Sequence, residues 1–202
     1  MNGLLRIADV MDRQVIRLGK LGSLVLLPLI AVIMFDVVTR RFPALSAAVR
    51  DGPLGGYLSS TQLQEMEWHL HGVVLFLALG MAYLRGAHVR IDILRSRTSR
   101  SRRAVIEAVG LLVLVLPFLA IVTYYGWFFV ERAYLSGEAS PSMAGLGHRW
   151  IIKFFLVFGI GLTLIAALSV LMRIIVFFRS GEESGDTLEI LLSTEDVSDS
   201  AG

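Results

Sequence analysis

Residues 104–130 read AVIEAVGLLVLVLPFLAIVTYYGWFFV, an apolar stretch interrupted by one acidic residue. Its length covers the roughly 20 helical residues that cross a hydrocarbon core about 30 Å thick. Inside a bilayer the backbone must hydrogen-bond to itself, so such a stretch forms a helix. Three further stretches of this kind occupy residues 21–40, 63–84 and 150–178. The sequence therefore predicts an all-α membrane protein with four transmembrane helices.

The composition agrees with a single membrane domain. Hydrophobic residues make up 55% of the 202-residue chain, and no segment outside the four stretches is long enough for a soluble domain. We expect an N-terminal tail at residues 1–20 and a four-helix membrane domain at residues 21–179. The absence of cysteine excludes thiolate metal sites and thiol catalysis. Without a phosphate-binding glycine loop or a nucleophile motif, we expect neither an enzyme nor a cofactor.

Residues 180–202 differ from the rest of the chain in charge. All 19 Lys and Arg precede this segment, which carries seven of the 17 Asp and Glu. An acidic segment rich in Ser and Gly is typical of disorder. We expect an acidic disordered C-terminal tail, with a partner-binding peptide as the alternative.

Basic residues predict the orientation in the membrane. The short segment between the second and third helices carries seven arginines: Arg85, Arg90, Arg95, Arg97, Arg100, Arg102 and Arg103. An excess of Lys and Arg marks the cytoplasmic side, so we expect this loop and both termini to be cytoplasmic. Its lack of interleaved aromatic residues argues against nucleic-acid binding. Aromatic residues suited to headgroup depth gather at the opposite helix ends: Trp68, Trp127, Trp150, Tyr124, Tyr125 and Tyr134.

The first apolar stretch ends in charged residues. It is longer than the apolar core of a signal peptide, and charges separate it from the small residues that follow, so we expect an uncleaved helix. Asp36 and Arg40 lie one helical turn apart, which predicts an ion pair. A lone charge at mid-bilayer costs about 2.5–3.5 kcal/mol, so pairing is favoured. We therefore predict a structural pair or subunit contact, with a functional ion site as the alternative.

The second helix is the most polar of the four. Its purely apolar part, residues 72–84, is too short to span a bilayer alone, so polar residues must supply its outer turns. Glu67 and His71 are i,i+4 neighbours there, and such groups avoid lipid, which indicates a face buried against protein. A metal site is the alternative, although the two-histidine i,i+4 spacing of a zinc helix is missing. Thr61 and Gln64 have the spacing of a capping box.

Two helices carry further structural signals. Pro117 predicts a kink within the third helix. Gly159, Thr163 and Ala167 form a stripe of small residues on the fourth helix. Such a stripe lets another helix approach closely, either inside the bundle or in a second protein.

The end of the second helix and the loop after it carry a resemblance to a known family. Gly80 is followed by RGAHVRIDIL at residues 85–94, while DVVTRRF closes the first helix and WIIK opens the fourth. These features resemble the small membrane subunit of tripartite ATP-independent periplasmic (TRAP) transporters over about residues 20–178. The chain departs from that family in a longer first outer loop and in its acidic tail.

The resemblance implies a role in a bacterial inner membrane. Such subunits work with a large membrane subunit and a periplasmic solute-binding protein to import organic acids, commonly C4-dicarboxylates or other carboxylates, with sodium. The large subunit holds the substrate and ion sites, and the small one scaffolds it. We further predict that Arg85, His88, Arg90 and Asp92 clamp the cytoplasmic loop to the membrane surface.

Two other functions remain open from the sequence. A small stand-alone proton-coupled transporter would use Glu65 or Glu67 as its proton site. A haem-binding anchor of a redox complex would need histidines on facing helices, whereas only His69 and His71 lie within a helix. Neither the carried solute nor the driving ion can be named from this chain.

Overall fold

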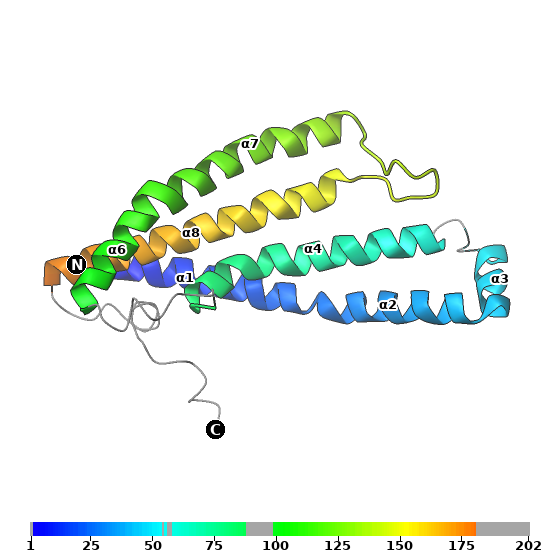
Figure 1. The fold of residues 1–202 in the computed structure, drawn as a ribbon, viewed down its shortest axis with the longest axis horizontal. Helices are drawn as coiled ribbons and strands as arrows, with labels where there is room; N and C mark the ends of the chain where they lie inside the picture. Colours follow the sequence, from blue (N-terminus) through cyan, green and yellow to red (C-terminus); the bar gives the residue numbers. More distant parts are fainter. Residues whose placement is uncertain (1, 54, 56–57, 88–98, 181–202) are drawn as a thin grey trace, which may run out of the picture. The chain divides into compact units, whose positions relative to one another are not determined.

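The computed structural model describes residues 2–53, 55, 58–87 and 99–180, all helical or in short connections (Figure 1). In chain order the elements are α1 (Asn2–Ser23), α2 (Leu26–Arg41), α3 (Pro43–Asp51), α4 (Ser60–Leu84), α6 (Arg100–Gly110), the π-helical turn η1 (Leu111–Val115), α7 (Leu116–Leu135) and α8 (Trp150–Ser180). Four helical segments are long and apolar enough to cross a membrane: Gly3–Arg41, Ser60–Leu84, Ser101–Leu135 and Trp150–Arg179. The predicted all-α class and the four spans are therefore confirmed. The predicted acidic tail lies outside the described residues.

The first helical segment is longer than the sequence indicates. Residues 2–20, which the hydropathy pattern leaves as a tail, belong to α1. Ala8, Asp12 and Val15 are buried at i,i+4,i+7 spacing, so α1 has one face toward the protein. Charged residues on its other faces lower the local hydropathy, and for that reason a hydropathy pattern misses this helix.

The first outer connection contains helix α3. Pro43 occupies the first helical turn, where its missing N–H costs nothing and its fixed φ favours helix formation. None of the residues of α3 is buried. The longer connection predicted here is therefore partly a short surface helix.

Pro117 lies two residues after the π-helical turn η1. A proline inside an α-helix has no N–H to donate and its ring crowds the carbonyl four residues earlier, which is Val113. Widening the turn at Leu111–Val115 to a π-helix relieves this conflict, and the helix continues through α7. The predicted disturbance at Pro117 thus takes the form of a π-helical turn.

The chain divides into two compact units. The first unit comprises Met1–Arg17, Leu79–Ile121 and Gly161–Gly202, and the second comprises Leu18–Ala78 and Val122–Ile160. Small and branched side chains form the core of the first unit: Ala8, Val15, Leu84, Ala104, Leu111, Ala166, Val170 and Ile174. The core of the second unit includes Leu29, Leu63, Leu77, Val130 and Val157.

Glycines allow close approach of α4 and α8 within each unit. In the second unit, a Cβ on Gly159 would collide with the backbone of Phe76. In the first unit, a Cβ on Gly80 would lie 3.2 Å from the backbone of Leu162 and 2.9 Å from the Val15 side chain. The sequence left open whether the small-residue stripe packs inside the bundle or against a second protein. At Gly159 the structure shows packing inside the bundle.

Candidate subunit interface

Asp36 is the centre of a polar cluster between α2 and α4 in the second unit. Its carboxylate pairs with Arg40 one turn later and accepts a hydrogen bond from Ser60 Oγ at 3.3 Å. The side-chain amide of Gln64 is oriented so that its oxygen faces Arg40. That oxygen accepts a hydrogen bond from Arg40 Nη1 at 2.8 Å. Asp36 is only 4% exposed, so these partners replace the water that its charge has lost. The predicted ion pair is present, and it joins the end of α2 to the first turns of α4.

The start of α4 is capped by its own sequence. Ser59 Oγ accepts from the backbone N–H of Gln62 at 3.3 Å, and Gln62 Oε1 accepts from the backbone N–H of Ser59 at 3.1 Å. This reciprocal pair is a capping box. The box predicted at Thr61 and Gln64 is therefore two residues too late, because Gln64 is turned to Arg40 instead.

Glu67 and His71 follow along α4. Glu67 is half-buried, and its charge acts favourably on Arg40. His71 is exposed and, within the described parts of the chain, has no hydrogen bond or ion pair.

One side of α4 carries four exposed residues at spacings of four, three and four: Gln64, Trp68, His71 and Leu75. These four residues, which we call the α4 outer face, lie along one side of the helix.

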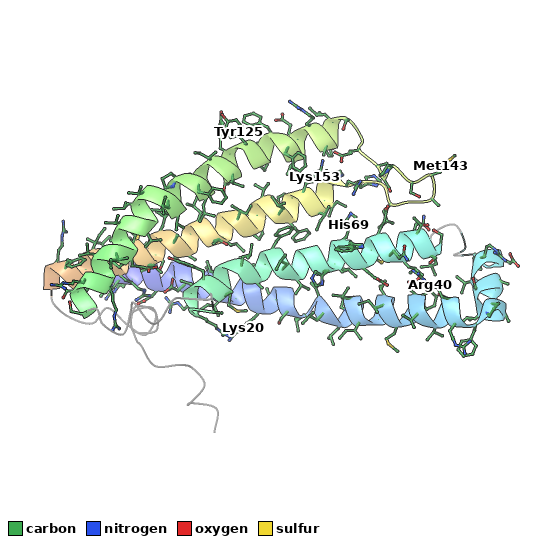
Figure 2. All side chains as sticks on the ribbon, viewed as in Figure 1. Lys20, Arg40, His69, Tyr125, Met143 and Lys153 are labelled. Carbon is green, nitrogen blue, oxygen red and sulfur yellow. The ribbon has the colours of Figure 1, made fainter. Side chains whose placement is uncertain are left out.

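A second polar cluster anchors the connection between α7 and α8. The Glu65 carboxylate accepts from Ser140 Oγ and from the backbone N–H of Leu146, the latter at 2.7 Å. His69 Nδ1 lies 2.6 Å from the Glu65 carbonyl oxygen, which can only accept, so Nδ1 carries the proton. Glu65 therefore holds the loop in place, and Met143 at its tip is fully exposed (Figure 2).

Lys153 adds a further tie to the same connection. Its ammonium pairs with Glu138, and it lies 3.7 Å from the centre of the Phe129 ring. The ring face favours a cation at this distance. The first turn of α8 is thus linked both to the loop and to α7 (Figure 2).

A third cluster, in the first unit, is missing from the sequence predictions. Arg173 in α8 donates to Asp12 through Nε (3.2 Å) and Nη2 (2.7 Å), and to Asp9 through Nη2 (2.6 Å). Ser169 donates to Asp12 as well. Arg173 is 4% exposed and Asp12 5%. An arginine inside an otherwise apolar helix is itself a signal for a buried partner, and it identifies Arg173 in retrospect.

The remaining predicted residues separate into two groups. Arg85 is exposed at the end of α4. His88, Arg90 and Asp92 lie outside the described residues, so the loop clamp stays a prediction. The roles of all eight candidates as interface residues stay predictions as well.

Nothing in the described residues suggests a chemical centre. Across residues 2–53, 58–87 and 99–180, no group of three His, Cys, Asp or Glu is placed to hold a metal ion. A hollow of about 360 Å³ is lined by the C-terminal end of α7 and the residue after it: Phe128, Glu131, Arg132, Leu135 and Ser136. The polar groups instead join helices and loops to one another.

Comparison with known proteins gives one result. The family model described as "Tripartite ATP-independent periplasmic transporters, DctQ component" matches residues 29–177. No curated protein and no solved structure matches the chain significantly. The match covers most of the chain and includes the clusters around Asp36 and Glu65. Of the third cluster it includes Arg173 and Ser169 but not Asp9 and Asp12. The chain therefore belongs to the DctQ family, the small membrane component of TRAP transporters, and is a multi-pass transporter subunit rather than an enzyme.

Proposed function

We propose that this chain is the scaffold subunit of a sodium-driven importer of an organic acid, a C4-dicarboxylate or another carboxylate. It acts in a bacterial inner membrane with a large membrane subunit and a periplasmic solute-binding protein. The observation that carries the proposal is the α4 outer face, which exposes polar groups within a membrane span. Both termini and the arginine-rich loop lie in the cytoplasm, in accord with the distribution of basic residues.

The length of α4 supports the proposal that its outer face contacts another protein. The helix has 25 residues, and about 20 are needed to cross the hydrocarbon core. Because only residues 72–84 are free of strongly polar groups, the turns holding Gln64 and His71 must enter the bilayer or its boundary. An ionisable group there faces protein or water rather than lipid. Because the same face also exposes Trp68 and Leu75, which do not favour water, a protein surface is the better cover for it. The large subunit is the partner that the family supplies.

The exposed face of α7 offers a contrast within the same unit. Between residues 124 and 129 all of its exposed side chains are aromatic: Tyr124, Tyr125, Trp127, Phe128 and Phe129. Tyr and Trp favour the lipid headgroup region, and Phe favours the acyl chains next to it. This face suits lipid, so the two helices differ in what they contact.

Photo-crosslinking tests the interface directly. A benzophenone amino acid is incorporated at position 71 or, as the matched control, at position 125, and all three components are produced together. We expect position 71 to crosslink to the large subunit and position 125 to give no protein adduct. Crosslinking from position 125 alone would contradict the assignment of the α4 outer face.

Transport by reconstituted components tests the function. We expect sodium-dependent carboxylate uptake only when this chain, the large subunit and the binding protein are combined. Uptake by this chain alone would support the stand-alone transporter instead. Full uptake without this chain would remove the scaffold role.

A further inference from the structure

Three arginines form a stripe on the outer side of α1. Arg6, Arg13 and Arg17 are all exposed. Their spacings of seven and four bring them within a narrow arc of the helix, and Lys20 continues the pattern. We refer to Arg6, Arg13 and Arg17 as the α1 basic stripe.

The opposite side of α1 is locked to the protein. Asp12 is buried and bound by Arg173 and Ser169, and Ala8 and Val15 are buried beside it. The cluster around Arg173 thereby fixes the rotation of α1 about its axis. As a result, the basic stripe has a defined direction, away from the core of its unit.

The length of the first helical segment places α1 near a membrane surface. Gly3–Arg41 has 39 residues, nearly twice the roughly 20 helical residues that cross a hydrocarbon core. The charge-free residues 21–35 suit the core of the bilayer. The charged half, α1, must therefore extend to the level of the headgroups.

Apolar residues accompany the arginines on the exposed side. Ile7 is 52% exposed and Val10 is 49% exposed. A helix that combines exposed aliphatic residues with a row of arginines fits a lipid surface, where the aliphatic groups meet acyl chains and the guanidinium groups meet phosphates. An acidic soluble partner would leave the aliphatic groups without a matching environment.

We propose that the α1 basic stripe binds the headgroups of anionic phospholipids and holds α1 against the membrane surface. Each guanidinium donates to a lipid phosphate, and the negative surface concentrates such lipids around the helix. Each arginine near the surface should enrich anionic lipid beside the helix by about fivefold. The proposal concerns lipid contact and holds whichever solute the transporter carries.

A site-specific quenching experiment tests this directly. Because the chain has no cysteine, Gln14→Cys, which is exposed one turn from Arg17, carries a single fluorophore. The full chain is reconstituted in mixed phosphatidylglycerol and phosphatidylcholine vesicles, and one lipid at a time bears a headgroup spin label. We expect spin-labelled phosphatidylglycerol to quench the fluorophore several-fold more strongly than spin-labelled phosphatidylcholine.

Two variants separate the stripe from net charge. Replacing Arg6, Arg13 and Arg17 by Gln should bring the quenching ratio close to one. Replacing Arg41, Arg50 and Arg132 by Gln removes the same charge from exposed positions in the second unit and should leave the ratio unchanged. An equal loss in both variants would overturn the proposal, because it would mean that net charge alone sets the ratio.

Salt provides a measurement that needs no variant of the stripe. At about 1 M salt the Debye length falls to about 3 Å, so electrostatic lipid preference should largely disappear. A quenching ratio of one for the unaltered stripe at low salt, or a lipid preference that survives high salt, would overturn the proposal.

Replacement of all three arginines by Lys keeps the charge and should preserve most of the lipid preference.

Discussion

Arg173 and Asp12 lie 161 positions apart in the sequence, yet Arg173 donates two hydrogen bonds to the Asp12 carboxylate. Both side chains are almost fully buried. The contact joins α1 to the C-terminal half of α8 within one unit. It therefore adds a buried polar tie to the apolar packing that holds α1 through Ala8 and Val15.

Arg173→Met should destabilise the protein by about 3–5 kcal/mol, because Asp12 would keep a buried charge without its main partner. Thermal or denaturant unfolding in detergent measures the loss. Arg179→Met is the matched control, since Arg179 is exposed near the end of the same helix, and it should change stability little. The double variant Asp12→Leu with Arg173→Met should recover part of the loss, and a loss equal to the sum of the single changes would contradict the pairing.

Gly159→Ala should destabilise the second unit by about 1–3 kcal/mol, since the new Cβ would collide with the Phe76 backbone and force the helices apart. Gly161→Ala provides the control two residues later, where a Cβ meets nothing within 4 Å. That change should be neutral or stabilise by up to about 1 kcal/mol through helix propensity. The melting temperatures of the two variants in one detergent give the comparison, and equal values would refute the close approach.

Glu65→Gln should loosen the loop between α7 and α8, because a neutral amide accepts more weakly than a carboxylate from Ser140 and Leu146. Hydrogen bonds to charged groups contribute about 1.5–3 kcal/mol, so exchange at the Leu146 amide should accelerate by about tenfold or more. Hydrogen exchange with mass spectrometry measures this effect. Glu131→Gln, an exposed carboxylate on α7, should leave the exchange unchanged. Unchanged exchange in the Glu65 variant would show that the loop is held by other contacts.

Met143→Cys and Ser99→Cys should be labelled from opposite sides of the membrane. Both positions are exposed, and the chain has no other cysteine. An impermeant maleimide added to intact cells should react at position 143 only, while inverted vesicles should react at position 99 only. Labelling of both from one side would contradict an odd number of crossings between them.

Local features of the structure follow well from the sequence. Asp36 and Arg40 are neighbours on any helix, so their pairing needs no knowledge of the fold. The position of the capping box is harder to predict, because both Ser59 and Thr61 can cap a helix and each has a Gln three residues later. Tertiary contact decides between them, since Gln64 bonds to Arg40 and leaves Gln62 to cap α4.

The sequence by itself determined that four helices cross a membrane and that the chain belongs with transporter subunits. The four spans can be read because the free energy of inserting a segment is close to a sum over its own residues, whichever neighbours it has. The likeness to transporter subunits rests instead on motif residues such as RGAHVRIDIL at 85–94. Only the tertiary structure decided that Arg173 meets Asp12, that Glu65 holds the loop at Leu146, and that Gly159 lies against Phe76. Such contacts depend on the rotation and stagger of packed helices, and hydropathy carries no information about either.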